Sequence, residues 1–121
     1  MNLKYPEIIM ELANFHEGKV INIQKSIHFY NKLKYENKSI KFQVFKYSDI
    51  STKDYKWYET YKKLYISKLE WKNIFELVDN KKIWIDTFDK FSLEIIKDNI
   101  KSIYGLKIQP SILYNLSLIH I

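Results

Sequence analysis

Six charged or amide side chains occupy alternate positions in four short apolar segments of this 121-residue chain. They are Glu11, Lys41, Gln43, Asp86, Lys107 and Gln109. Successive residues of a strand point to opposite faces, so this spacing gives each strand one apolar and one polar face. If the polar face lies inside the protein, its lysines must pair or hold an anion, because an unpaired buried charge is costly. A sheet with one face in solvent explains the same spacing.

The segments that position these side chains alternate between strands and helices. Apolar runs predict strands at residues 8–13, 39–45, 83–86 and 106–109, the last introduced by Gly105. Apolar residues at helical spacing predict helices at residues 20–33 and 92–99. Ser67 and Glu70 form a capping box that begins another helix, reaching about residue 78. A long polar and aromatic loop with a helical turn is expected at residues 47–65.

The resulting order, βαβαβαβ, predicts an α/β fold with parallel strands and right-handed crossovers. Four such strands make the N-terminal half of a TIM-type (β/α)8 barrel, which typically has about 250 residues. A complete small doubly wound sheet is the structural alternative. The residues expected to pack against the helices are Ile8, Met10, Phe42, Val44, Ile83, Ile85 and Ile108.

Two motifs of the chain carry a family resemblance. Residues 10–18 are Met-Glu-Leu-Ala-Asn-Phe-His-Glu-Gly, and residues 41–46 are Lys-Phe-Gln-Val-Phe-Lys. They resemble Ala-Glu-Ile-Gly-x-Asn-His-x-Gly and Lys-Phe-Gln-Thr-Phe-Lys, the first- and second-strand motifs of the sialic acid synthase (N-acetylneuraminate synthase) family. Shorter likenesses follow in order, with Leu-Glu-Trp at residues 69–71, Phe-Asp at 88–89 and Leu-Lys-Ile at 106–108.

The resemblance implies part of a barrel enzyme that condenses phosphoenolpyruvate with an N-acyl amino sugar, releasing phosphate and forming a nonulosonic acid. Matching positions imply phosphoenolpyruvate binding by Lys41, Lys107, Thr87 and Ser111, sugar binding by Gln43, a catalytic acid at Glu11, and a first loop shaped by Asn14 and His16. The resemblance also implies a divalent metal, Mn or Mg, with ligands on later strands outside this chain. The complete protein is expected to be a homodimer.

Two later motifs depart from the family pattern. In an ungapped alignment with the family's Ser-Thr-Pro-Phe-Asp, Asp86 replaces the phosphate-contacting Thr, and Thr87 lies one position later. Ser111 is also one position late after Lys107. An Asp beside a phosphate repels it unless a Lys or a metal intervenes. The departures predict either a divergent subfamily or a degenerate enzyme.

The formal net charge is +6, and every basic residue is a lysine. This balance suits anionic partners, but arginine, the usual residue for phosphate and guanine contacts, is absent. A solvated lysine surface is therefore favoured over a nucleic-acid patch. One functional alternative remains a basic α/β nucleic-acid-binding module, with bases stacking on Trp57, Tyr58, Tyr61 and Tyr65. The other is a non-catalytic sugar-binding homologue.

The chain contains no cysteine and no apolar run near the roughly 18 residues that cross a bilayer. These absences predict a cytoplasmic protein without a membrane segment. Residues 1–115 are expected to form the barrel part. Residues 116–121, Leu-Ser-Leu-Ile-His-Ile, could be an ordinary apolar strand, but the translation of a sequencing-library adapter is favoured, so His120 is not counted as a site residue. A reading frame extended past Asn115 should encode further βα units with histidines.

Overall fold

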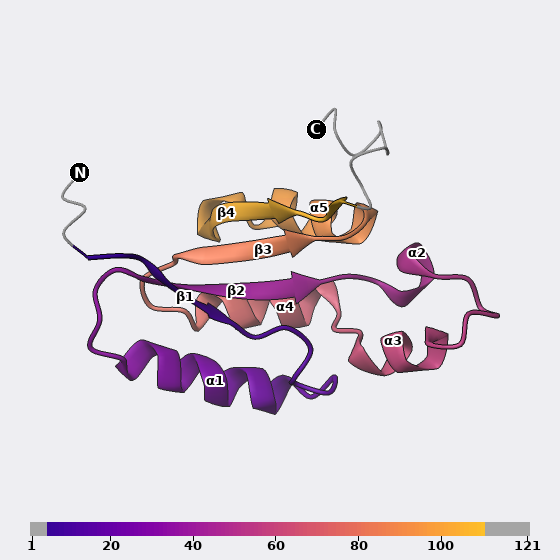
Figure 1. Ribbon diagram of the computed structural model, residues 1–121, viewed down its shortest axis with the longest axis horizontal. Coiled ribbons are helices and arrows are strands. Elements are labelled where there is room, and N and C mark those ends of the chain that lie inside the picture. Colours follow the sequence, from indigo (N-terminus) through magenta and orange to yellow (C-terminus); the bar gives the residue numbers. More distant parts are fainter. Residues whose placement is uncertain (1–4, 111–121) are drawn as a thin grey trace.

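The computed structural model describes residues 5–110, so Ser111 and residues 116–121 lie outside the described part of the chain. Four parallel strands form one sheet in chain order (Figure 1). They are β1 (Ile8–Glu11), β2 (Lys38–Val44), β3 (Ile83–Thr87) and β4 (Ile103–Ile108). The predicted parallel α/β order is confirmed, with strands separated by helices.

Three longer helices connect the strands and lie on one side of the sheet (Figure 1). They are α1 (Val20–Lys32), α4 (Lys68–Glu76) and α5 (Lys90–Asp98), the last followed by a 3-10 turn, η1 (Ile100–Ser102). Two short helices, α2 (Tyr47–Ile50) and α3 (Tyr58–Leu64), lie beyond the carboxyl end of β2. Within residues 5–110, no helix covers the opposite side of the sheet, which we call the open face.

The core lies between the sheet and the three longer helices. Phe42 of β2 packs edge-on against Trp71, with ring centroids 5.7 Å apart, and beside Phe75 at 5.9 Å. Val44, Ile83 and Ile85 are fully buried in the same cluster, as predicted. Met10 is partly buried against it. Burial of these apolar side chains is the main force that holds helices and sheet together.

The prediction was wrong for Ile8 and Ile108, which are 50% and 56% exposed. Both residues lie on the edge strands of the sheet, β1 and β4. The three longer helices cover the middle of the sheet best, so residues at the ends of the edge strands remain uncovered. Leu106, also on β4, is 45% exposed for the same reason.

Two strand boundaries differ from the prediction. The first strand ends at Glu11 rather than at residue 13, because Ala13 adopts a positive φ of 46° and its amide donates to Oε1 of Glu11. Gly105 does not introduce the last strand but lies inside β4, opposite Trp84. A Cβ at Gly105 would lie 2.5 Å from the Trp84 ring. Glycine is therefore needed here because an indole crosses the neighbouring strand.

The segment predicted as a loop contains the two short helices α2 and α3. Tyr47 begins α2 and packs edge-on against Tyr58 and Tyr65, at centroid distances of 5.4 and 5.5 Å. Tyr65 in turn contacts Phe91 of α5, at 5.6 Å. This aromatic packing fixes the segment against the body of the protein. Periodicity could not show it, because the helices are only four and seven residues long.

Candidate functional site

The first part of the site joins β1 and β2. The two strands pair with Glu11 opposite Lys41, and the Lys41 ammonium forms an ion pair with Oε2 of Glu11. The other carboxylate oxygen of Glu11 accepts the amide of Ala13, so the side chain is held at the start of the first loop. The Lys41 side chain is only 16% exposed. A largely buried cation with one partner is a suitable group to bind a small anion.

The second part joins β3 and β4. Asp86 is fully buried, and its Oδ1 accepts a 2.6 Å hydrogen bond from Nε2 of Gln109. Its Oδ2 has no hydrogen-bond partner in the described part of the chain but lies 3.6 Å from the ammonium of Lys107, which is half exposed. Asp86 is thus the anion that holds Lys107. The buried Asp86 carboxylate is tolerated at this position because the Lys107 ammonium lies directly beside it.

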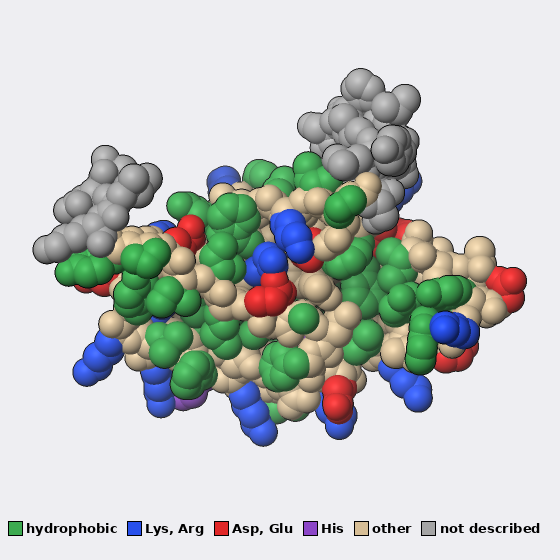
Figure 2. Space-filling model, viewed as in Figure 1, with side chains coloured by type: hydrophobic (Ala, Val, Ile, Leu, Met, Phe, Trp, Pro, Cys, Tyr) green, Lys and Arg blue, Asp and Glu red, His purple; other side chains and the backbone are tan. Residues whose placement is uncertain are grey.

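The strand register brings these two pairs onto one face. Gln43 is opposite Asp86, and Asp86 is opposite Lys107, while Lys41 pairs with Trp84 one level below. The residues of both pairs and Gln43 point away from the helices, and all but Lys41 lie at or next to the carboxyl ends of their strands, whereas Lys41 is the middle residue of β2. Figure 2 shows lysine and acidic side chains side by side at the centre of the open face, among hydrophobic ones. In parallel α/β proteins this edge of the sheet is where ligands bind.

The structure does not bring Thr87 into this group. Thr87 pairs with Val44 and Ile108, so it lies in a row that faces the helices, and it is 2% exposed. Among residues 5–110, its hydroxyl has no hydrogen-bond partner. Thr87 is one position later than the family's phosphate-contacting Thr. Because side chains alternate along a strand, this shift of one position turns Thr87 towards the helices instead of the open face.

The first βα loop is built around His16. Its ring is buried, and Nδ1 accepts a 2.9 Å hydrogen bond from the amide of Gly18. The carbonyl of His16 accepts from the side chain of Asn22 at 3.1 Å, which ties the loop to the first turn of α1. Oδ1 of Asn14, in the same loop, is buried and has no hydrogen-bond partner among the residues that the structure describes. Burial lowers the pKa of His16, so the neutral ring is the stable form.

The pKa of His16 predicts a loss of stability in mild acid. The folded state binds the His16 proton less tightly than the unfolded state, whose pKa is near 6.5. The contribution is present above that value and is lost as the pH falls below it. We expect the free energy of unfolding to fall by at most about 2 kcal/mol from this group between pH 6.5 and 5.

The measurement is urea unfolding at several pH values for the wild type and for His16→Asn. The asparagine oxygen can accept the Gly18 amide but does not titrate, so the variant should lose less stability over this range. Equal losses in the two proteins would show that other groups cause the pH dependence.

The Phe88-Asp89 motif of the sequence does not by itself assign a role to Asp89. Asp89 is 4% exposed and precedes α5. Its Oδ1 accepts the amide of Ser92 and its Oδ2 accepts the amide of Lys46, both at 2.8 Å. Asp89 thus caps α5 and ties it to the end of β2. The signal in the sequence is a capping pattern, Asp-x-x-Ser, directly after a strand.

No family model matches the sequence, and no curated protein matches it. Among solved structures, the fold is similar to that of a Chromobacterium violaceum ATCC 12472 protein assigned as spore coat polysaccharide biosynthesis protein E. The TM-score is 0.72 at 16% identity, over 96% of this chain. The chain has the fold of part of a (β/α)8 barrel. It spans 37% of the length of that neighbour, and at this identity the likeness shows the fold alone.

The described part of the barrel does not fit a metal site. Within residues 5–110, no three His, Cys, Asp or Glu side chains are grouped so as to hold a metal ion. Asp86, the most buried carboxylate of the open face, is already held by Gln109 and Lys107. Residues 5–110 include no helix that is both long and apolar enough to span a membrane.

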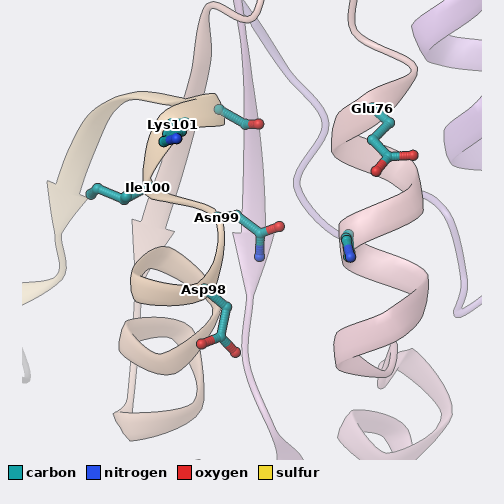
Figure 3. A pocket seen from close by; sticks show the side chains of 7 residues that line it. Glu76, Asp98, Asn99, Ile100 and Lys101 are labelled. Carbon is teal, nitrogen blue, oxygen red and sulfur yellow. The ribbon is translucent and has the colours of Figure 1, made fainter.

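A hollow of about 290 Å³ lies elsewhere, between the end of α4 and the η1 turn after α5 (Figure 3). Glu76 lines it from α4, while Asp98, Asn99 and Lys101 line it from the other side. It belongs to the helical layer and contains no residue of the open face. Its mixed charges and open shape give it no group that is poised to react.

Proposed function

We propose that the chain is the N-terminal part of a nonulosonic acid synthase, which condenses phosphoenolpyruvate with an N-acyl amino sugar in carbohydrate biosynthesis. The observation that carries the proposal is the position of Lys41 and Lys107. Both lie on the open face of the parallel sheet, Lys107 next to the carboxyl end of β4 and Lys41 opposite the last residue of β1, each paired with one carboxylate. The two motifs around Glu11 and Lys41 supply the link to this reaction.

In this proposal the lysines bind the carboxylate and the phosphate of phosphoenolpyruvate. Each ammonium is held by a carboxylate in the free protein, Glu11 for Lys41 and Asp86 for Lys107. When phosphoenolpyruvate binds, each lysine exchanges its carboxylate partner for the ligand or is shared between the two. The positive charges of the lysines offset the negative charge that develops on the phosphate as it leaves. A hydrogen bond between charged groups contributes about 1.5–3 kcal/mol.

Glu11 and Gln43 act on the second substrate. Glu11 is at the end of β1, where its carboxylate lies between the Lys41 ammonium and the first loop. A carboxylate in this position can orient the sugar or move a proton at the carbons that join. Gln43 is partly exposed and has no hydrogen-bond partner among the described residues, so its amide is available to bind the sugar.

Replacing Lys41 with methionine tests the proposal. The change removes the charge and approximately keeps the volume, so phosphoenolpyruvate should bind about ten- to a hundredfold more weakly. Folding should survive, because Glu11 is 39% exposed and keeps its hydrogen bond to Ala13. The measurement is a calorimetric titration of each protein with phosphoenolpyruvate, with urea unfolding as the check on folding.

Lys107→Met should weaken the same binding, but it also leaves the buried Asp86 with Gln109 alone, so its stability must be measured beside its affinity. Gln43→Ala is the matched control, since it should weaken sugar binding and leave phosphoenolpyruvate binding unchanged. Unchanged phosphoenolpyruvate affinity in Lys41→Met and Lys107→Met would reject the proposed function. Tight RNA or DNA binding that both variants lose would support the nucleic-acid alternative instead.

A further inference from the structure

Four aromatic side chains extend outward from the open face at the carboxyl end of the sheet. Phe45 follows β2 directly, two positions after Gln43, and is 5% exposed without belonging to the core beneath the helices. Residues two apart on a strand share a face and lie roughly 7 Å apart. Phe45 therefore lies beside the amide that the proposed function assigns to the sugar.

From Phe45 the rings continue onto the α2–α3 segment. Phe45 contacts Phe88 on one side and Tyr61 of α3 on the other, each with centroids 5.9 Å apart. Tyr61 then stacks on Tyr55, 6.2 Å away with the planes inclined by 21°. We call Phe45, Phe88, Tyr61 and Tyr55 the mouth cluster. It connects the buried end of β2 with a tyrosine that is 45% exposed.

We propose that the mouth cluster is the surface on which the N-acyl amino sugar lies. The inference rests on the proposed function, and adds residues that the family motifs do not contain. Small-molecule sites combine aromatic walls with a few polar groups that fix orientation, and here Gln43 is the polar group beside the aromatic wall. The accessible rings, Tyr55, Tyr61 and Phe88, contact the C–H faces of the sugar and its acyl methyl, while the tyrosine hydroxyls stay in contact with water. The buried Phe45 packs against Phe88 and Tyr61 and holds them in place.

The charges around Tyr55 favour a neutral ligand over a nucleic acid. Lys53 and Lys56 alternate with Asp54 and Glu59 on the same segment, and Lys62 and Lys63 follow Tyr61. Acids therefore interrupt the positive charges around the rings. A hydrogen bond from Thr52 lowers the pKa of Asp54, which keeps this carboxylate charged beside the stack. A phosphate backbone would meet these acids, whereas a sugar tolerates both signs. Hydrophobic side chains gather over α2–α3 with charges of both signs between them (Figure 2).

The test is a pair of titrations on the 121-residue chain, one with N-acetylhexosamines and one with phosphoenolpyruvate. Tyr55→Ala should weaken N-acetylhexosamine binding about tenfold and leave phosphoenolpyruvate binding unchanged. Tyr55→Phe keeps the ring and should retain sugar affinity within about twofold. Phe29→Ala removes an aromatic ring that is 60% exposed on α1, and serves as the matched control with no effect on either ligand.

The outcomes separate this inference from the proposed function. If phosphoenolpyruvate binds through Lys41 but Tyr55→Ala leaves sugar binding unchanged, the mouth cluster is packing alone and the inference fails. Absence of sugar binding to the wild type also overturns it, as does an oligonucleotide that binds at Tyr55 in place of the sugar. If phosphoenolpyruvate affinity is the same in Lys41→Met and Lys107→Met as in the wild type, the proposed function is rejected, even where Tyr55 binds a sugar.

Discussion

Gly18→Ala is expected to lower the free energy of unfolding by about 3 kcal/mol. Gly18 has a φ of +76°, a conformation that costs an alanine about 1 kcal/mol. The larger part comes from space, because a Cβ at Gly18 would lie 1.7 Å from the carbonyl oxygen of Lys63. That atom belongs to the backbone of α3, so the first loop and the helix must move apart. Urea unfolding of the two proteins measures the effect.

Gly105→Ala provides a matched comparison with a side chain as the obstacle. There the three atoms nearest to a Cβ all belong to the Trp84 ring, the first at 2.5 Å, and a half-buried indole can rotate away. We expect a smaller loss, about 1–2 kcal/mol, and almost none when Gly105→Ala is made in a Trp84→Leu background. A Gly18→Ala loss no larger than that of Gly105→Ala would show that the loop and α3 separate easily.

The elements that the sequence predicts well are those with strong local signals. The helix α1 matches the predicted residues 20–33 within one position, because Ile23 and Ile27 bury one face of it. The capping box at Ser67 and Glu70 is present, with both reciprocal hydrogen bonds. Boundaries set by tertiary contacts were predicted less well. Gly105 is inside a strand because of Trp84, a residue 21 positions earlier that no local pattern connects to it.

The candidate site shows the same division. Alternation along the strands predicts that Glu11, Lys41, Gln43, Asp86 and Lys107 share a face, and the register brings them together. Alternation cannot tell which lysine pairs with which acid. The ion pairs Glu11–Lys41 and Asp86–Lys107 depend on the order of strands in the sheet. In the same way, the hydrogen bond from the Lys46 amide to Asp89 depends on the geometry of the loops. The mouth cluster likewise requires the position of α3, which periodicity did not predict.

Asp89→Ala is the second change with a large expected effect, a loss of about 3 kcal/mol in the free energy of unfolding. The alanine leaves the amides of Lys46 and Ser92 without their acceptor. Loss of a helix cap costs about 0.5–2 kcal/mol, and a buried amide left without a partner costs about 1–3 kcal/mol. Because Lys46 follows the mouth cluster residue Phe45, the change should also loosen the end of β2. Amide hydrogen exchange at Lys46 would detect this directly.

The pH dependence and an isosteric variant make the assignment of Asp89 specific. Burial raises the pKa of Asp89, so the folded state binds its proton more tightly than the unfolded state. The stability gained from that proton is present below the unfolded pKa near 3.8 and is lost as the pH rises through the folded value. The loss of stability caused by Asp89→Ala should therefore be larger near pH 4 than at pH 7.

Asp89→Asn keeps one acceptor oxygen but turns an NH2 group towards the other amide, so its loss of stability should be intermediate. Equal losses in the two variants at pH 7 would mean that only one of the two hydrogen bonds contributes to stability.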